Sequence, residues 1–546
     1  MDINHSAFYK VLYSFLALCV GLSGFAQNWN QITKTTASDR NSNDWFGYSV
    51  SISGDYAIIG ADQEDDDTSG INSMIDAGSA YIFERNVAGN WNEVQKIVAS
   101  DRANFDFFGS SVSISGDYAV VGAFGEDDDI VGNNNMGYSG SAYIFERNSF
   151  GHWNQVQKII ASDRNANDRF GNSVSISGDY IAIGAFQEDD DPLGNNSRFN
   201  SGSVYIFERN RLGVWNQVQK VVASDRSGGD RFGTSVSISG NYSIIGAPEE
   251  DHDVLGANSM SDAGSAYIFE RSATGVWNEV KKVVASDRAT SDLLGYSVSI
   301  SGDYSIIGAF SEDEDVSGSS TMNSAGASYI FERDSSGIWS EVQKIVASDR
   351  TQDDFFAFSV SISGIYAIVG AHAEDEDITG SNSLSLAGSA YIFKRNSSGI
   401  WNETQKIVAS DRAIDDRFGW STAISGNDAI AGAIYEDENN IGRVTRNNAG
   451  SAYIFKTNST VGLIENNFRD EILLYPNPSV TDFSIDLGAN YKSVNISITD
   501  LTGRLIQTKK YYNSQLLNVN LEASKGVYLL KIESDHKKAV VRLIRK

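Results

Sequence analysis

The chain has 546 residues, with 71 acidic and 43 basic side chains, 50 glycines, four prolines and one cysteine. Its hydrophobic fraction of 41% and aromatic fraction of 11% suffice for a large core, which argues against intrinsic disorder. The net charge of −28 repels phosphate groups. We therefore expect no nucleic-acid partner, and cations, neutral glycans or basic proteins fit the charge better.

Residues 1–26 have the pattern of a secretory signal peptide: Lys10, a short apolar run and small residues up to Ala26. A membrane anchor would need about 20 apolar residues, and no other stretch approaches that length. Lipidation at Cys19 is an alternative, although the preceding Leu18 is larger than such signals prefer. We expect a mature chain that is exported, has no thiol and no transmembrane segment, and is a monomer.

A repeat of 62 residues follows, and tryptophan reveals its period. Phe46-Gly47 and Gly60-Ala61 recur at the same step, with Leu294 and Ala357 as variants of the first pair. Seven of the nine tryptophans occupy the same position in successive repeats: Trp29, Trp91, Trp153, Trp215, Trp277, Trp339 and Trp401.

Each repeat contains four short segments rich in β-branched and aromatic residues, separated by turn residues. In the second repeat these are residues 111–115, 118–122, 141–146 and 153–161. Gly116-Asp117 suits the two-residue turn of a hairpin. The spacing predicts a four-stranded antiparallel meander in every repeat.

Seven such meanders predict an all-β fold, a seven-bladed β-propeller. The chain enters the series in a fourth strand and leaves it in a third, so we expect residues 28–37 to supply the missing outer strand and close the ring. A linear β-solenoid is the alternative, but such repeats are usually shorter and end in atypical caps.

The second repeat also carries Phe108-Gly109, Ser111-Val112 and Gly122-Ala123, with Asp101-Arg102 upstream and a Gly-Ser-Ala-Tyr-Ile-Phe run from Gly140. With these residues the repeat resembles the FG-GAP repeat of integrin α-subunit propellers, and a shorter bacterial variant is closer still. The resemblance implies a propeller over residues 27–457 that is used for adhesion and ligand binding, and implies no activity by itself.

A polar linker is predicted over residues 458–471, and residues 472–546 are predicted to form a small antiparallel β-sandwich. This tail contains Tyr475-Pro476-Asn477-Pro478, Asp500 to Arg504 and Gly526-Val527-Tyr528 before a basic end. It is similar to the type A sorting domain of the type IX secretion system, which implies a Bacteroidetes-type cell, outer-membrane passage through that machinery, and surface attachment or release. An accessory binding sandwich is the alternative.

An acidic cluster follows each Gly-Ala pair, on the face that also holds the loops between repeats. Calcium takes six to eight oxygen ligands, and Asp65, Asp67 and Ser69 precede a turning glycine with the spacing of a calcium loop. Integrin propellers hold calcium in a different loop, so the resemblance assigns no ligand here. Solvated acidic loops are the alternative to the candidate calcium ligands, which are Asp65, Asp67, Ser69, Asp127, Asp129, Asp189, Asp191, Asp251, Asp253, Asp313, Asp315, Ser317, Asp375, Asp377, Thr379, Asp437 and Asn439.

Two other recurrent features have structural interpretations. We expect the arginine of each Asp-Arg pair, such as Arg102, to fix the loop between repeats through bidentate pairing with nearby aspartates. The seven repeated tryptophans are expected to cover the edges of the sheets, with stacking on sugars as the alternative.

Catalysis needs tuned groups that break the repeat symmetry at one site, and the five histidines offer no such set. His252 and His372 fall in loops of the acidic face two repeats apart, and His152 falls on the other side. We therefore expect no enzyme but a secreted or cell-surface binding or adhesion propeller, with an extracellular glycan or protein as ligand. A structural surface-layer protein is the alternative, and an enzyme acting on extracellular polysaccharides is the third possibility.

Overall fold

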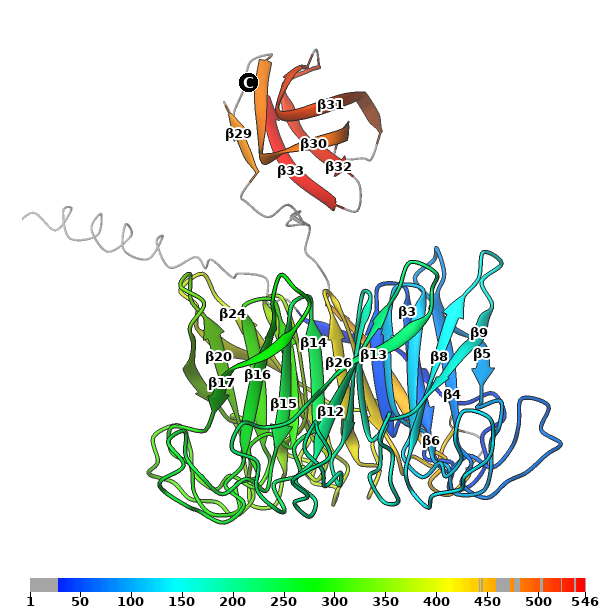
Figure 1. Cartoon of the computed structure of the whole chain (residues 1–546). Coiled ribbons are helices and arrows are strands. Elements are labelled where there is room, and N and C mark those ends of the chain that lie inside the picture. Colours follow the sequence, from blue (N-terminus) through cyan, green and yellow to red (C-terminus); the bar gives the residue numbers. More distant parts are fainter. Residues whose placement is uncertain are drawn as a thin grey trace, which may run out of the picture. The chain divides into compact units, whose positions relative to one another are not determined.

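The protein was analysed as a computed structural model that describes residues 28–440, 442, 445–457, 472–475, 482–500, 504–521, 523–534 and 537–545. These residues form two compact units, one built from the repeats and one from the strands after residue 471 (Figure 1). The predicted signal segment 1–26 and linker 458–471 lie outside the described residues. In the part that is described, all regular secondary structure is β, and no helix is long and apolar enough to cross a membrane.

The unit that is built from the seven repeats contains 28 strands, and the first of them is β1 (Trp29–Thr35). The next twelve are β2 (Ser49–Ser53), β3 (Tyr56–Ala61), β4 (Ser79–Arg85), β5 (Trp91–Ile97), β6 (Phe108–Ser115), β7 (Tyr118–Ala123), β8 (Ser141–Arg147), β9 (Trp153–Ile159), β10 (Ser173–Ser177), β11 (Tyr180–Ala185), β12 (Ser203–Arg209) and β13 (Trp215–Val221). The remaining fifteen are β14 (Ser235–Ser239), β15 (Tyr242–Ala247), β16 (Ser265–Arg271), β17 (Trp277–Val283), β18 (Ser297–Ser301), β19 (Tyr304–Ala309), β20 (Ala327–Arg333), β21 (Trp339–Ile345), β22 (Phe356–Ser363), β23 (Tyr366–Ala371), β24 (Ser389–Arg395), β25 (Trp401–Ile407), β26 (Phe418–Ser425), β27 (Asp428–Ala433) and β28 (Ser451–Thr457).

These strands form seven four-stranded sheets, all with antiparallel neighbours, which confirms the predicted meander. In the sheet β6–β9 the first hairpin turns at Gly116, whose φ of +60° is costly for any residue with a Cβ atom. The long loops leave from one edge of the sheets, at the bottom of the repeat unit in Figure 1, and the short hairpins leave from the other edge.

The last sheet is completed by the first strand, as predicted. Its order is β1-β28-β27-β26, and β1 runs antiparallel to β28 with Trp29 opposite Thr457. The innermost strands contact one another in sequence, and β2 contacts both β6 and β26. The seven sheets therefore form a closed ring, and the solenoid alternative is wrong.

The apolar core lies between neighbouring sheets. One cluster joins Ile58 and Ile82 of the first sheet to Phe108 and Val121 of the second, and similar clusters fill the other interfaces. The closing interface joins Ile59 to residues of β27 and β28. Burial between sheets means that no sheet has a complete core alone, which is why the repeats depend on one another.

The Phe-Gly pair sits where adjacent sheets come closest. Phe108 is fully buried and meets the Tyr143 ring edge-on, with 5.5 Å between centroids. A Cβ atom on Gly109 would lie 2.3 Å from the carbonyl oxygen of Ser79 in the preceding sheet. Ala357 takes the glycine position in one repeat, with a strained φ of +74°.

Glutamines of the outermost strands link adjacent sheets around the circumference. The Gln95 side chain accepts a hydrogen bond from the Trp153 amide at 2.9 Å and donates one to the Trp153 carbonyl at 2.6 Å, as a paired strand would. The same clamp is made by Gln157, Gln219, Gln343 and Gln405, the last on Trp29 across the ring closure. Lys281 and Thr33 occupy the two remaining positions, where no described bond replaces the clamp.

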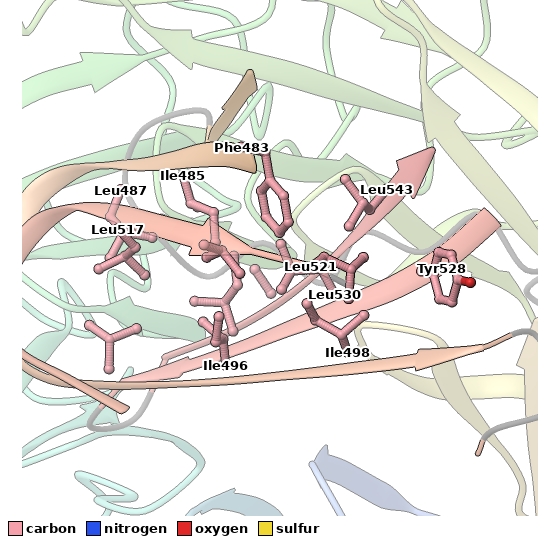
Figure 2. Close-up of a cluster of buried hydrophobic side chains, with 14 residues drawn as sticks. Phe483, Ile485, Leu487, Ile496, Ile498, Leu517, Leu521, Tyr528, Leu530 and Leu543 are labelled. Atoms are coloured by element: carbon pink, nitrogen blue, oxygen red, sulfur yellow. The ribbon is translucent and has the colours of Figure 1, made fainter. Parts of the chain in front are cut away.

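The second unit consists of β29 (Leu473–Tyr475), β30 (Asp482–Asp500), β31 (Leu505–Asn520), β32 (Gly526–Ser534) and β33 (Lys537–Arg545). All pairings are antiparallel, in the order β29-β30-β32-β33, with β31 also on β30. The β30–β31 register shifts after Asp486, and the sheet curls around Phe483, Ile496, Leu530 and Leu543 (Figure 2). The predicted antiparallel unit is therefore one curled sheet with an apolar interior. Pro476–Pro478 and Thr502–Gly503 of the predicted motifs lie outside the described residues.

Candidate functional site

The first residue of each acidic cluster is a buried partner of a lysine from the outermost strand. Glu126 is 2% exposed, and Lys158 Nζ lies 2.8 Å from both Glu126 Oε2 and Asp101 Oδ2. The Tyr143 hydroxyl donates to the other Asp101 oxygen at 2.9 Å. The same lysine bridges occur in all seven sheets, through Lys34, Lys96, Lys158, Lys220, Lys282, Lys344 and Lys406.

The candidate calcium ligands lie in the loops between the second and third strands of each sheet, where nitrogen and hydroxyl donors occupy their carboxylates. Asp65 Oδ1 accepts the Asp76 amide at 2.8 Å, and Asp127, Asp189, Asp251, Asp313, Asp375 and Asp437 do the same eleven residues before their partners. Asp67 Oδ1 accepts both the amide and the hydroxyl of Ser69, at 2.8 and 2.6 Å.

The second aspartate of each pair closes the loop tip. Hydrogen bonds lower the pKa of Asp67, Asp129, Asp191, Asp253, Asp315 and Asp377, and bring that of Asp253 to about 2, with backbone amides as the main donors there. Ser317 and Thr379 donate to Asp315 and Asp377 as Ser69 does to Asp67, and Asn439 takes the place of the aspartate in the last loop. Within the described residues no three His, Cys, Asp or Glu side chains form a group that could hold a metal ion. Calcium binding stays a prediction.

Each Asp-Arg pair connects two sheets. Asp101 faces forward to Lys158 and Tyr143 of the second sheet, whereas Arg102 reaches back to the first, donating to the carbonyl oxygens of Asn72 at 2.7 Å and Asp65 at 2.6 Å. The loop between sheets is fixed, as predicted, but the predicted bidentate pairing with aspartates is wrong. The nearby carboxylates already have lysine, tyrosine or backbone donors, while the carbonyl groups of the acidic loop need one.

The seven repeated tryptophans are buried between sheets and unavailable as a surface for sugars. Trp153 is 1% exposed and meets Tyr56 of the preceding sheet edge-on at 5.8 Å. The interpretation that they cover sheet edges is confirmed.

The repeat symmetry breaks at the acidic-face ends of the inner strands. There, three residues of each repeat differ from sheet to sheet although the adjoining Phe-Gly and Gly-Ala pairs hardly change. We call these residues the axial rosette. Its first set is Tyr48, Ser110, Asn172, Thr234, Tyr296, Phe358 and Trp420, its second is Trp45, Phe107, Arg169, Arg231, Leu293, Phe355 and Arg417, and its third is Asp62, Phe124, Phe186, Pro248, Phe310, His372 and Ile434.

One arc of the rosette is a continuous aromatic cluster that spans four sheets. Ring centroids are 5.1 Å apart for Tyr296 and Phe358, 4.8 Å for Phe358 and Trp420, and 6.0 Å for Trp420 and Tyr48. Each of these four residues is partly buried and partly exposed. The two tryptophans that are not part of the repeat, Trp45 and Trp420, both belong to this arc.

The opposite arc carries small polar residues with guanidinium groups beside them. Ser110, Asn172 and Thr234 take the first positions in the sheets β6–β9, β10–β13 and β14–β17. The Arg169 guanidinium lies 5.5 Å from the Phe124 centroid and 5.8 Å from that of Phe186, within cation–π range. Arg169 makes no ion pair with any described residue, and its Nε is buried without a partner.

The second set of the rosette has a strained backbone. All seven of its residues have φ between +54° and +60°, a region that glycine occupies at little cost. No glycine occurs in this set, although glycines fill many of the turns around it. Large side chains held in strained backbone suggest that the side chains themselves are needed there.

Comparison with protein families identifies the family of the unit that is built from the repeats. Seven matches to the FG-GAP repeat cover residues 29–83, 91–145, 153–207, 215–269, 277–331, 339–393 and 401–455. The chain belongs to the FG-GAP repeat family. Residues 473–546 match the secretion system C-terminal sorting domain. A search of curated proteins found no match.

The FG-GAP ring is therefore exported by the type IX secretion system, and its sorting domain implies engagement with that machinery. Secretion or display at the cell surface follows from the same domain.

Two buried polar groups of the FG-GAP rosette have unpaired atoms. Asp62 is 3% exposed and its Oδ1 has no hydrogen-bond partner in the described structure, and the same holds for Nδ1 of His372 at 4% exposure. Burial raises the pKa of Asp62 well above its ordinary value and lowers that of His372 to about 3, so the His372 ring is neutral near pH 7.

The rosette could not be recognised from the invariant motifs because its positions vary from repeat to repeat. The sequence places His372 in a loop of the acidic face, but its neighbours Phe355, Phe358 and Trp420 come from loops and strands of two repeats. An available signal was the variation itself, at three positions that adjoin invariant Phe-Gly and Gly-Ala pairs.

Proposed function

We propose that this protein is a non-catalytic binding or adhesion propeller, displayed at or released from the cell surface, whose ligand contacts the axial rosette. The observation that carries the proposal is the distribution of variation. The lysine bridges and Asp-Arg links repeat around the ring, whereas the rosette differs in every sheet. A site for one asymmetric ligand needs such a difference, and a ring that serves only as a scaffold does not.

The proposal assigns recognition, and no catalytic step, to the polar groups of the rosette. The His372 ring packs against Phe355, Phe358 and Trp420, and its Nδ1 has no partner among the described residues that could orient it as a base. Asp62 lies two sheets away around the ring without a hydrogen-bonded nucleophile at its Oδ1.

A structural surface-layer role is the second candidate, favoured by the uniformity of the seven lysine bridges. Adhesion of producing cells to their extracellular polymer separates the two. We expect Trp420→Ala to reduce attachment, while Phe150→Ala, an exposed aromatic in a hairpin at the other edge of the sheets, leaves it unchanged. Unchanged attachment with loss of cell-surface integrity on removal of the whole protein would favour the structural role.

We also propose that calcium binds and stabilises the acidic loops. A calcium ion at Asp65 and Asp67 would take oxygens that now accept amide and hydroxyl hydrogens, so its net effect is a balance of these interactions. Thermal unfolding with and without millimolar calcium measures it, and an unchanged melting temperature together with no heat of binding would remove calcium from the proposal.

A further inference from the structure

We propose that the ligand of the axial rosette is a neutral glycan, with sugar rings stacked on the aromatic arc and hydroxyl groups bound by the polar arc. This rests on the proposed binding function and assigns a chemical class to its ligand. Four features of the rosette support it, and each concerns a different property of a saccharide.

The aromatic arc matches the apolar face of a sugar ring. Tyr296, Phe358, Trp420 and Tyr48 follow one another at 4.8–6.0 Å between centroids, and all four residues are partly exposed. Aromatic rings with one buried and one wet side are suited to ligands that are partly apolar and partly hydroxylated. A run of four rings offers more than one stacking position, as a chain of sugar units would use.

The polar arc matches the hydroxyl groups of the same ligand. Asn172 and Thr234 are half-buried, with hydroxyl and amide groups that both donate and accept. The Arg169 guanidinium lies within cation–π range of Phe124 and Phe186 and makes no ion pair with any described residue, and a guanidinium carries only donors. The first set of the rosette is therefore small and polar in three sheets and aromatic in the other four.

Charge selects for an uncharged ligand. Three guanidinium groups, those of Arg169, Arg231 and Arg417, belong to the second set and repel a cationic side chain that could otherwise bind the aromatic arc. Arg231 and Arg417 have carboxylate partners in Glu249 and Asp415, whose oxygens lie 2.9 and 2.8 Å away. The acidic loops of the same face repel a polyanion. A neutral ligand avoids both penalties.

The two buried polar groups complete the set. Asp62 Oδ1 and His372 Nδ1 are unpaired, and the His372 ring packs against Phe358 and Trp420 of the aromatic arc; such atoms are costly unless a partner arrives. A hydroxyl group can both donate and accept, so it can pair with either of these atoms.

The test uses the exported protein and three probes: neutral gluco-, galacto- and manno-oligosaccharides, oligomers of a uronic acid, and an arginine-rich peptide. Titration is followed by calorimetry and by tryptophan fluorescence, which reports on Trp45 and Trp420 over the constant signal of seven buried tryptophans. We expect a neutral oligosaccharide to bind, and Trp420→Ala to weaken that binding roughly tenfold.

Three variants make the result specific. Trp45→Phe with Trp420→Phe keeps aromatic packing but should abolish the fluorescence response to the sugar. Arg169→Met should weaken binding several-fold without making it dependent on salt, because hydroxyl groups carry no charge. Phe150→Ala is the control and should bind as the unaltered protein does.

Two outcomes would overturn the inference, and they differ. If only the uronic acid oligomer or the peptide binds, and Trp420→Ala weakens it, the ligand class is wrong while the proposed binding function stands. If no probe binds in a way that depends on the rosette, and Trp420→Ala leaves cell attachment intact, the binding function fails and the rosette is an aromatic cap of the ring.

Discussion

The lysine bridge around Lys158 and the axial rosette lie on the same face of the FG-GAP ring but are built in opposite ways. The bridge recurs seven times with the same three partners, of which the glutamate and the tyrosine are buried, and all three are hydrogen-bonded or ion-paired. The rosette changes in every sheet, and it contains strained backbone and unpaired atoms such as Asp62 Oδ1. Stability therefore resides in the repeated positions, and specificity is expected where repetition stops.

Tryptophan substitutions test this division most directly, because the chain has tryptophans at repeated positions and in the rosette. Trp215, a repeated residue, is 2% exposed, whereas Trp420 of the rosette is half-buried. Trp215→Ala should lower the free energy of unfolding by about 3–5 kcal/mol, and Trp420→Ala by about 1–2 kcal/mol. Denaturant unfolding measures both. Equal losses would contradict the division.

Removing one lysine should be nearly as damaging. Lys158→Met leaves the carboxylates of Glu126 and Asp101 without their counter-charge in a site where the lysine side chain is 7% exposed. We expect a loss of about 3 kcal/mol in the free energy of unfolding. The control is Asp117→Asn, which breaks an exposed pair with Arg147 and should cost less than about 1 kcal/mol. Ligand binding by the rosette should survive both changes.

The pH dependence of stability should come from the buried aspartate that caps each loop between sheets. Burial raises the pKa of Asp106 to about 8, from 3.8 in an exposed group. It also raises the pKa of the equivalent aspartates of the other repeats to between about 6 and about 8; these are Asp44, Asp168, Asp230, Asp292, Asp354 and Asp416. The folded state therefore binds more protons than the unfolded state between these values. The stabilisation is complete below the unfolded pKa and is lost as pH rises through the folded one.

Unfolding measured from pH 5 to pH 9 checks this sign. We expect stability to fall with rising pH, by at most about 1.4 kcal/mol per pH unit for each such group. Asp106→Asn keeps that position uncharged at every pH. It should therefore reduce the slope of stability against pH by the contribution of one aspartate. A stability that rises from pH 5 to pH 8 would show that these carboxyl groups are ionised in the fold.

Strain at a repeated position should be small and correctable. Ala357 has a φ of +74° where other repeats have glycine, so Ala357→Gly should stabilise the protein by about 1 kcal/mol. The reverse change, Gly109→Ala, would bring a Cβ atom to 2.3 Å from the Ser79 carbonyl oxygen and should destabilise by more than that. A neutral result at both positions would mean that the backbone relaxes freely there.

The sequence alone was sufficient for the strands of each repeat and for the closure of the ring. The tryptophan period, the Gly116 turns and the incomplete last repeat predicted the sheets and the closing strand, because each follows from local propensity and a fixed period. The partners of Arg102 were not predictable in the same way. Its two acceptors are backbone carbonyl groups, which leave no trace in the identity of residues 65 and 72. The rosette needed the closed ring, since Tyr48 and Trp420 are 372 residues apart in the chain and adjacent only after β1 joins β28.

The smallest expected effect concerns the seams of the ring. Five seams have a glutamine clamp, but Lys281 stands where the clamp to Trp339 would be. Lys281→Gln should restore two hydrogen bonds to the Trp339 backbone and stabilise the ring by about 0.5–1 kcal/mol, since both groups are part-buried in the clamps that exist. Gln219→Lys, which removes the clamp on Trp277, is the matched reverse change. If the two substitutions shift the denaturation midpoint in opposite directions and by similar amounts, the clamps contribute as independent links. If Lys281→Gln has no effect while Gln219→Lys destabilises, the lysine seam is already satisfied by solvent, and repetition at this position serves assembly of the ring more than its stability.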